Sequence, residues 1–579
     1  MGPAGWKFDV GFCVFAAVFA ALGVRLYAVQ VRGHEKAARE QAVQAWATET
    51  VQPRRGEILD ARGEKLAITK EVPSCFADPA LMDDVEATAA ALSGLLGVDR
   101  AALVARFRRP GSRFVWVKRR CTPEEEAAVR GRRLAGVGFE DDTRRAYPRG
   151  RSLGQVLGYV DIDGHGLEGI EKQFQEVLEG RAGERQVLRD ARRDLIVSFE
   201  RSVREPEPGN TLVLTVDARI QALAEQALAR AMAKHSPESA VAVVMDPRNG
   251  AILAIAGAPD YDPNDPARGK AEARRCRAAT DFWEPGSTFK GVVMAALMEK
   301  GAVKASDTFN CEGGSWTYRG RSITDVHGYG TLTVEDILVK SSNIGMAKMV
   351  TRMGAKDLET WIRTFGFGKP TGVGIPGESP GTMPREQTWA PQTVISASFG
   401  YAVGATPLQM AAAYCAIANG GVLVTPHLVK AVVGPDGVPR DEFAISPGKR
   451  VLSAKVSRDL VSIMIQVVER GTGKSVKLDG WLAAGKTGTT KLLGANGKYA
   501  AGKYASSFVG FAPADAPRLL VVVVVKEPQG AYYGGTVAGP VVGEILKEGL
   551  ALLEVKPDPD GVKRKREEWA KRAAGGAKK

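Results

Sequence analysis

Residues 282–301 read FWEPGSTFKGVVMAALMEKG, and this stretch is the starting point for the fold. Pro285 and Gly286 predict a turn, and the apolar residues after it recur at helical spacing. The pattern places Ser287 at the start of a helix and Lys290 one turn on, on the same face. A serine hydroxyl is a poor nucleophile without an adjacent base, which a partly buried lysine can supply. Serines at helix starts are more often simple N-caps, so the segment needs support from elsewhere.

A second segment, residues 334–354, has a helical pattern that is interrupted by Ser341, Ser342 and Asn343. Small polar residues disfavour helix interiors because they compete for backbone hydrogen bonds. They are tolerated where their side chains face a cleft, and there Ser341 could relay a proton while Asn343 holds a substrate amide. The alternative is an ordinary turn between two helices.

The third segment, residues 480–491, reads GWLAAGKTGTTK and predicts a strand that starts near Trp481. Glycine inside a strand often marks the close approach of a ligand or another backbone, which singles out Gly488. Lys486, Thr487 and Thr489 beside it would suit a substrate carboxylate. The alternative is a turn at the end of a strand.

The remaining pattern predicts one sheet built from distant parts of the chain. Strands and helices alternate from residue 211 onward, and an Asn249-Gly250 turn predicts a hairpin. The clearest segments are a strand at 211–217, a helix at 218–235, the hairpin at 240–260, a strand pair at 506–513 and 518–528, and a closing helix at 541–555. Strands at both ends with helices between them predict an α/β or α+β domain.

Composition narrows the function classes. The chain has 579 residues, 44% hydrophobic and 25% charged, which predicts several folded domains. Its net charge of +13 fits a nucleic acid, an anionic membrane or an acidic polymer equally well. Residues 469–475, ERGTGKS, imitate a phosphate-binding loop, but Val468 stands where that loop needs glycine. We therefore expect no nucleotide and no nucleic-acid ligand.

The cysteines and histidines predict no metal site. None of the six cysteines forms a Cys-x-x-Cys pair, and the five histidines have no zinc-ligand spacing. We expect no metal and no other cofactor. Nothing in the spacing proposes a disulfide, so buried free thiols are the expectation.

The N-terminus predicts a membrane segment. Residues 10–24 carry no charge, and a mostly apolar stretch continues past Arg25 to residue 31. A span needs roughly 20 apolar residues, and Arg25 can extend its side chain toward the interface. We expect an uncleaved anchor at 10–31 after a short cytoplasmic stretch at 1–9. A signal peptide is the alternative.

Together the three motifs resemble the Ser-x-x-Lys, Ser-x-Asn and Lys-Thr-Gly set of penicillin-binding proteins and β-lactamases, in that order. Nearly the whole chain resembles class B penicillin-binding proteins, the monofunctional peptidoglycan D,D-transpeptidases. PRRGEILDARGEKLA at 53–67 looks like that family's pedestal signature, and ASFGYAVGATPLQM at 397–410 like part of its transpeptidase domain. EPGST at 284–288 and SSNIGMAKM at 341–349 look like the septal, cell-division type.

The resemblance implies an architecture. A penicillin-binding/β-lactamase-like transpeptidase domain, with an antiparallel sheet flanked by helices, would follow an extended α+β pedestal. The Pro- and Gly-rich break at 204–210 separates them. The expected ranges are 32–205 for the dimerisation-like pedestal, 206–555 for the transpeptidase domain and 556–579 for a basic, disordered tail. That tail has nine basic and four acidic residues.

The resemblance also implies the chemistry. Ser287 would attack the penultimate D-alanine carbonyl of a stem peptide, with Lys290 as base, kept neutral by Lys486. Ser341 would pass a proton to the leaving amine. Backbone N–H groups of Ser287 and Thr489 would form the oxyanion hole. The carboxylate of the donor would be bound by Thr487, Gly488 and Thr489. Its peptide backbone would be bound by Asn343.

An amine from a neighbouring stem would then resolve the acyl-enzyme, and β-lactams would acylate the same serine. The implied setting is a single-pass anchor in the bacterial inner membrane with a periplasmic catalytic domain. The implied partners are other cell-division proteins and a membrane-embedded glycosyltransferase that uses lipid-linked strands. Three alternatives stay open: an elongation-type transpeptidase, a carboxypeptidase or β-lactamase, and a catalytically weak division scaffold that binds β-lactams.

Overall fold

The computed structural model describes residues 5–28, 46–189, 195–385, 389–442, 447–494 and 497–576. These residues form two compact units. The first comprises residues 1–54 and 179–209, and the second comprises residues 55–178 and 210–579. The predicted pedestal range of 32–205 contributes to both units, so its boundary with the catalytic domain stays a prediction.

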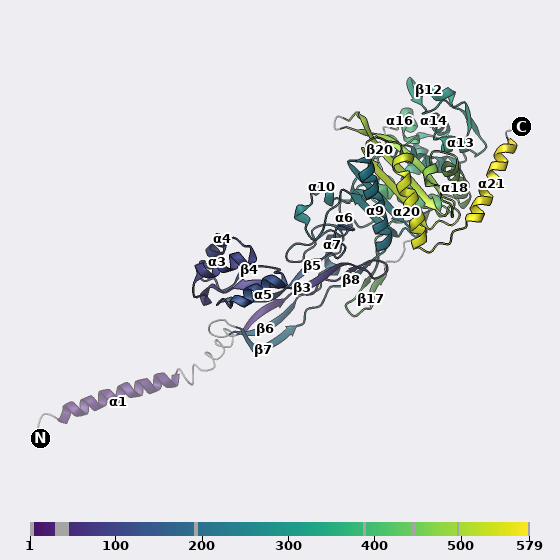
Figure 1. The fold of residues 1–579 in the computed structure, drawn as a ribbon. Helices are drawn as coiled ribbons and strands as arrows, with labels where there is room; N and C mark the ends of the chain where they lie inside the picture. The colour runs from purple at the N-terminus through teal and green to yellow at the C-terminus, as the bar shows by residue number, and fades with distance from the viewer. Residues whose placement is uncertain are drawn as a thin grey trace. The chain divides into compact units, whose positions relative to one another are not determined.

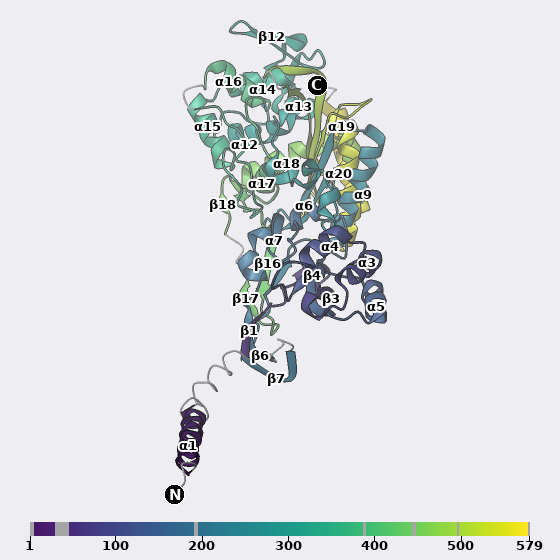
Figure 2. The same cartoon turned by 90° about the vertical axis from the view of Figure 1, so that its left-hand side faces the viewer.

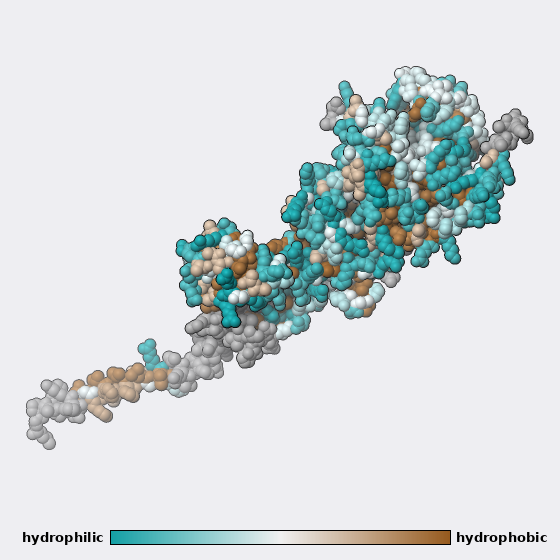
Figure 3. Space-filling model, viewed as in Figure 1, coloured by the Kyte–Doolittle hydropathy of each residue, from teal (hydrophilic) through white to brown (hydrophobic). Residues whose placement is uncertain are grey.

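The first unit contains one long apolar helix, α1 (Gly5–Tyr27). Its stretch Val10–Tyr27 is long and apolar enough to cross a membrane, with a mean hydropathy of 2.0. The described side chains of α1 are exposed, and they form the brown and tan rod in Figure 3. Residues 29–31 of the predicted span lie outside the described residues.

A small antiparallel sheet completes the first unit, with strand order β1-β6-β7. Its strands are β1 (Trp46–Val51), β6 (Gly183–Arg189) and β7 (Leu195–Arg204).

The second unit contains a five-stranded antiparallel sheet with strand order β10-β9-β21-β20-β19 (Figure 1). Its strands are β9 (Ser239–Met245), β10 (Ile252–Ala258), β19 (Ala484–Leu493), β20 (Tyr499–Ala512) and β21 (Leu519–Lys526). The two outer strands come from distant parts of the sequence, as predicted. The strand that carries the third motif begins at Ala484, three residues later than expected.

Strand β21 shows why the middle of this sheet forms. All residues from Leu519 to Val525 are buried, because the strand lies between two neighbours and has helices on both faces. Val521 and Val523 pack into the cluster with α9 (Ala218–His235) and α20 (Gly539–Leu552). The alternating Val522 and Val524 pack into the opposite cluster, with α17 (Pro407–Ala418) and α18 (Ala454–Glu469). A run of β-branched residues therefore fills both layers of the core.

Helices that carry or support the candidate site lie mostly on one side of this sheet (Figure 2). They are α12 (Lys290–Glu299), α13 (Val334–Lys340), α14 (Asn343–Val350), α15 (Ala355–Thr364), α16 (Pro391–Ser398), α17 (Pro407–Ala418) and α18 (Ala454–Glu469). The short strand pairs between them are β11 (Thr308–Asn310) with β14 (Thr331–Thr333), β12 (Ser315–Tyr318) with β13 (Arg321–Thr324), and β15 (Val422–Leu423) with β18 (Lys449–Arg450).

A second large sheet has the strand order β17-β16-β8-β2-β3-β4, with β5 paired to β3. Its strands are β2 (Ile58–Leu59), β3 (Lys65–Ala77), β4 (Val115–Lys118), β5 (Val137–Ala146), β8 (Thr211–Leu214), β16 (Val429–Val433) and β17 (Pro439–Glu442). The helices α3 (Val85–Leu96), α4 (Arg100–Phe107) and α5 (Pro123–Arg132) pack on its β3–β4 end around their own apolar cluster.

These two large sheets, with helices packed on them, confirm the predicted α/β (α+β) class. The predicted hairpin at 240–260 is β9 and β10, and the strand pair near the end is β20 and β21. Five of the six cysteines are buried and all six are free, as expected.

The buried carboxylate of Glu171 links the pedestal signature, residues 53–67, to later parts of the chain. Glu171 is fully buried between two arginines. Arg55 Nε donates to Glu171 Oε2 and Arg145 Nε donates to Oε1, both at 2.7 Å. Removing the carboxylate would leave two buried guanidinium groups without their counter-charge.

The predicted disordered tail at 556–579 is wrong over most of its length. Residues 559–576 form α21 (Pro559–Gly576), shown in yellow near the C-terminus in Figure 1. Val562 is buried and Trp569 packs against the core. Arg566 makes a two-pronged ion pair with Glu469, at the end of α18. The excess of basic residues gives no sign of these contacts, which offset the conformational entropy lost when a basic segment becomes ordered.

We predict that Glu171→Ala lowers the free energy of unfolding by about 3–5 kcal/mol, because it leaves two buried arginines unpaired. Denaturant unfolding of the purified chain in detergent measures this. Glu176→Ala, at an exposed position on the next short helix, is the matched control. Equal effects of the two substitutions would contradict a structural role for the buried pair.

Candidate active site

Ser287 lies in a tight 3-10 turn, η4 (Gly286–Phe289), immediately before α12. Gly286 has a φ of 55°, and a Cβ there would lie 2.4 Å from Thr490 Oγ1. Only glycine lets β19 approach the turn so closely. Ser287 is partly exposed while Gly286 and Thr288 are buried, so the serine is the accessible residue of the turn.

Lys290 connects the first motif to the second. It is fully buried at the start of α12. Its Nζ donates to Ser341 O at 2.6 Å, to Ser341 Oγ at 3.2 Å and to Asn343 Oδ1 at 2.8 Å. Burial lowers the pKa of Lys290 to about 7, against the opposing effect of the Asp325 carboxylate. An amine with this pKa is substantially unprotonated near neutral pH, as a general base must be.

The second motif is a turn between two helices whose side chains also face the site. Ser341 ends α13 in a left-handed conformation with a φ of 59°. Ser342 then caps α14, accepting from Gly345 N at 2.9 Å. The two alternatives for this segment, a turn between helices and a group of polar residues that face a cleft, are therefore both met by the same three residues.

Lys486 lies on β19, the outer strand of the five-stranded sheet, and is fully buried. Its Nζ donates to Ser341 Oγ at 2.9 Å. Ser341 Oγ thus lies between the two lysine side chains. Burial lowers the pKa of Lys486 well below its usual value, and the charge of Lys290 lowers it further. Desolvation lowers the pKa of Lys290, so its neutral form follows from burial, and the expected contribution of Lys486 stays a prediction.

Gly488 lets the same strand lie against the serine turn. A Cβ there would lie 2.4 Å from Ser507 Oγ and 2.9 Å from Thr288 Cγ2. The hydroxyls of Thr487 and Thr489 have protein partners already. Thr487 Oγ1 lies 2.8 Å from Thr472 Oγ1, and Thr489 Oγ1 accepts from Gly534 N at 3.0 Å.

The structure thus joins Lys290, Ser341, Asn343 and Lys486 by direct hydrogen bonds. Ser287 lies on the adjoining turn. Among the described residues, the structure records no hydrogen bond for its hydroxyl. Catalytic hydrogen bonds often tighten only when substrate is bound.

Asp325 is a site residue that the sequence analysis missed. Its carboxylate accepts from Ser342 Oγ at 2.5 Å, from Ile344 N at 3.1 Å and from the backbone N–H of Asn343. It therefore holds the turn of the second motif in place. Asp325 is 35 residues from Lys290 and belongs to none of the three motifs, so no spacing rule points to it.

Thr472 was also missed, because its segment 469–475 was examined only as a nucleotide-binding motif. In the structure this segment connects two parts of the site. Arg470 forms ion pairs with Glu335 and Asp336 in the first turn of α13. Thr472 contacts Thr487 on β19.

A third missed residue, Glu284, precedes the serine turn. Its carboxylate accepts from Ala402 N at 2.7 Å and from Tyr499 Oη at 2.8 Å. Burial raises the pKa of Glu284. The carboxylate therefore fixes the segment leading to Ser287 against the loop that contains Ala402 and against the start of β20.

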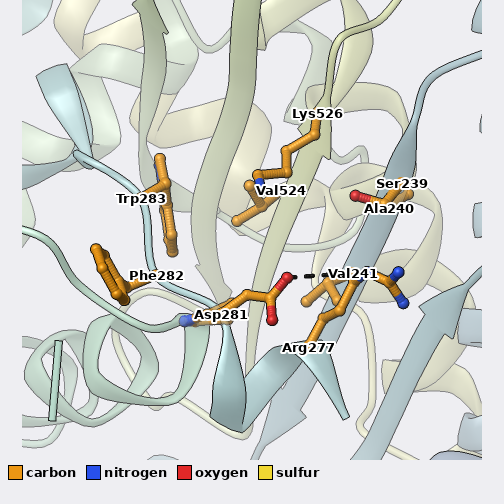
Figure 4. A pocket seen from close by; sticks show the side chains of 10 residues that line it. Ser239, Ala240, Val241, Arg277, Asp281, Phe282, Trp283, Val524 and Lys526 are labelled. Atoms are coloured by element: carbon orange, nitrogen blue, oxygen red, sulfur yellow. Dashed lines mark ion pairs between the residues drawn. The ribbon is translucent and has the colours of Figure 1, made fainter. Parts of the chain in front are cut away.

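A small cavity nearby is separate from these residues. It lies between β9, β21 and the segment 277–283, and Figure 4 shows Arg277 and Asp281 facing each other across a gap of 3.9 Å. Phe282 and Trp283 line its other side. None of the predicted site residues lines it, so it is not the reaction site.

Among the described residues, no group of three or more His, Cys, Asp or Glu side chains is placed to hold a metal ion.

Two family descriptions match the chain. The penicillin binding protein transpeptidase domain matches residues 240–547, and the penicillin-binding protein dimerisation domain matches residues 50–214. Among curated relatives, the probable peptidoglycan D,D-transpeptidase PenA of Neisseria gonorrhoeae is 35% identical, over 88% of this chain and 86% of its own. The peptidoglycan D,D-transpeptidase FtsI of Escherichia coli is 33% identical, over 96% of this chain and 93% of its own.

Solved structures agree with this match. A peptidoglycan synthetase from Bifidobacterium adolescentis has a TM-score of 0.71 at 28% identity, covering 89% of this chain and 98% of its own. Penicillin binding protein 3 from Mycobacterium tuberculosis, complexed with aztreonam, has a TM-score of 0.69 at 28% identity, covering 88% and 98%. The fold is thus that of the serine transpeptidases which β-lactams bind. This chain belongs to the penicillin-binding protein family, as its motifs predicted.

We predict that Asp325→Asn shifts the pH dependence of acylation by a β-lactam. The Asp325 carboxylate raises the pKa of Lys290, in opposition to the effect of burial. Without it the amine is free at lower pH, so the half-maximal rate moves below pH of about 7. The maximal rate also falls, because the asparagine amide keeps only one of the two oxygens that accept hydrogen bonds from the second motif.

Acylation rates measured from acidic to alkaline pH test this. Glu312→Gln is the control, since Glu312 pairs with Lys348 on α14 and is not among the groups that shift the pKa of Lys290. An unshifted profile in the Asp325 variant would show that its carboxylate does not act on the base.

Proposed function

We propose that this chain is a peptidoglycan D,D-transpeptidase that cross-links stem peptides during septal cell-wall synthesis through an acyl-enzyme on Ser287. The observation that carries the mechanism is the position of Ser341 Oγ, 3.2 Å from Lys290 Nζ and 2.9 Å from Lys486 Nζ. This arrangement provides a neutral amine near the serine and a hydroxyl through which a proton can pass. Similarity to FtsI over 96% of the chain supports the septal type.

In the first half-reaction, neutral Lys290 takes the hydroxyl proton of Ser287 as Oγ attacks the carbonyl carbon of the penultimate D-alanine. The carbon–nitrogen bond to the terminal D-alanine then breaks. The proton returns from Lys290 through the Ser341 hydroxyl to the departing nitrogen, so that D-alanine leaves as an amine. The product is an ester between Ser287 Oγ and the stem peptide.

In the second half-reaction, the amine of a neighbouring stem attacks that ester. Its nitrogen loses a proton to the same lysine and hydroxyl pair, and Ser287 Oγ recovers a proton when the ester bond breaks. A peptide bond forms between the two stems. Lys486 stays uncharged in this scheme because burial disfavours a second ammonium group beside Lys290.

Backbone N–H groups of Ser287 and Thr489 are our candidates for the oxyanion hole. The close approach of β19 to the serine turn at Gly488 supports this assignment, since it brings the two backbones together. Thr487 and Thr489 would bind the donor carboxylate through their hydroxyl protons. Asn343 Oδ1 accepts from Lys290 and Nδ2 donates to Thr324 O at 2.9 Å, so one Nδ2 hydrogen is left for the peptide backbone.

A β-lactam would follow the first half-reaction and stop. Its amide nitrogen stays tethered to the acyl group after the ring opens, so the leaving group blocks the incoming amine. Relatives solved with aztreonam and with ampicillin support this outcome.

We propose that α1 anchors the protein as a single pass in the bacterial inner membrane and that the catalytic domain lies in the periplasm. The apolar stretch Val10–Tyr27 and the FtsI-like relatives support an anchored protein with an extracellular catalytic domain. Cell-division proteins and a membrane-embedded glycosyltransferase are the partners that follow from this role.

We predict that a fluorescent penicillin labels the full-length chain on Ser287, because that hydroxyl is the only motif serine on the accessible turn. Peptide mapping after labelling identifies the residue. Ser287→Ala should abolish the label, whereas Ser446→Ala, in the Ser-x-x-Lys sequence at 446–449, should keep it. Absence of label in folded protein would point instead to a division scaffold.

We also predict that the acyl-enzyme prefers an amine to water. With an N-acyl-D-alanyl thioester donor, in which a thiol replaces the terminal D-alanine as leaving group, added D-amino acid should divert most product from hydrolysis to aminolysis, as measured by mass spectrometry. Release of penicillin should take far longer than labelling. Rapid release of hydrolysed penicillin would identify a β-lactamase, and hydrolysis undiminished by added amine would identify a carboxypeptidase.

A further inference from the structure

A second cavity, of about 310 Å³, lies beneath the C-terminal helix α21. Three segments enclose it: residues 480–482, the turn 513–518 between β20 and β21, and residues 555–565. None of the residues placed in the active site lines it. Its volume is at the lower end of the range for small-molecule sites and corresponds to about ten water molecules.

The walls of this cavity are held in place by contacts that need no ligand. Trp481 Nε1 donates to Lys556 O at 3.2 Å, and Asp558 N donates to Gly480 O at 2.8 Å. Arg566 fastens α21 from outside the cavity by donating to Glu469 and to Leu478 O. The space is therefore built by the fold and does not depend on an occupant.

Positive charge faces the cavity in excess. Arg518, Lys556 and Lys565 line it together with Asp515 and Asp558. Both carboxylates are already engaged. Asp515 pairs with Lys565 at 3.3 Å, and Asp558 accepts from Gly561 N at 2.9 Å in the first turn of α21. The three cationic side chains that line the cavity therefore outnumber its two carboxylates by one.

Arg518 supplies a second, independent observation. Its Nε is buried, and among the described residues it has no hydrogen-bond acceptor. A buried guanidinium N–H without an acceptor is costly, and such a group in a native fold calls for a bound water or ion. Because Arg518 lines the cavity, an occupant of the cavity can supply this acceptor.

Apolar side chains adjoin these charges. Trp481, Leu482 and Val562 line the cavity beside them. An occupant that fits both features carries an anionic group toward Arg518 and Lys556 and an apolar group toward the indole.

We propose that this cavity is a binding site for a small anionic molecule with a carboxylate or phosphate next to an apolar group. Arg518 and Lys556 bind the anion, and Trp481 with Val562 contacts the apolar part. The site is distinct from the donor-carboxylate site on β19, and it does not depend on the transpeptidase reaction.

The experiment uses the full-length chain in detergent, labelled with 5-fluorotryptophan. Trp481 is one of nine tryptophans, and its ¹⁹F resonance is the one that disappears in Trp481→Phe. The probes are N-acetyl-L-alanyl-L-alanine, its C-terminal amide and phenyl phosphate. The L-dipeptide is chosen because it is not a D,D donor for the active site.

We expect at least one of the two acids to shift the Trp481 resonance saturably, and the neutral amide to leave it unchanged. Whichever acid binds more tightly identifies carboxylate or phosphate as the preferred group. Arg518→Gln should weaken binding about tenfold or more, the loss expected for one charge-assisted hydrogen bond. Lys563→Gln, at an exposed position of α21 outside the cavity, should bind like the parent chain.

If Arg518→Gln fails to fold, as judged by thermal unfolding, binding is measured with Lys556→Gln in its place. Equal binding of the dipeptide and its amide would overturn the proposal, as would binding that is unchanged in the folded variants. A Trp481 resonance that none of the probes moves would overturn it too.

Discussion

The candidate site depends on the burial of Lys290. A lysine in water holds its proton until strongly alkaline pH, and it cannot then act as a base. On α12, Lys290 is removed from solvent. The negative charge that acts on its amine is the carboxylate of Asp325. Desolvation and this single negative charge oppose each other, and the balance leaves the amine near the point of half-protonation at neutral pH.

Burial of Lys290 in turn requires polar partners, because a buried amine without them would destabilise the fold. The turn after α13 supplies them through Ser341 and Asn343. That turn adopts its strained conformation because Asp325 binds its backbone and the Ser342 hydroxyl. The second motif therefore supports the base as well as facing the substrate. The segment around Arg470 and Thr472 then connects α13 to β19, so the three motifs are fastened to one another.

Much of this could be predicted from local pattern. The spacing of Ser287 and Lys290, the break at Ser341 and the glycine at 488 each reflect a constraint that acts over a few residues. The hairpin around Asn249 and the apolar run of β21 are equally local signals. Asp325 and Thr472 could not be found this way, since their importance comes from contacts with residues distant in sequence. The tail was misjudged for the same reason: its charges suggested solvation, but Arg566 and Val562 have partners on the core.

The strand order of the two large sheets also determines how late in synthesis the chain can fold. Strand β9 pairs with the central strand β21, which lies about 280 residues later, and β2 pairs in parallel with β8. Strands β16 and β17, beyond residue 428, complete the sheet that begins at residue 58. Neither large sheet can therefore close until most of the polypeptide has emerged. Contacts so distant in sequence slow folding and leave unpaired strand edges exposed meanwhile. During synthesis, the early half must remain protected from aggregation and proteolysis until the last strands have formed.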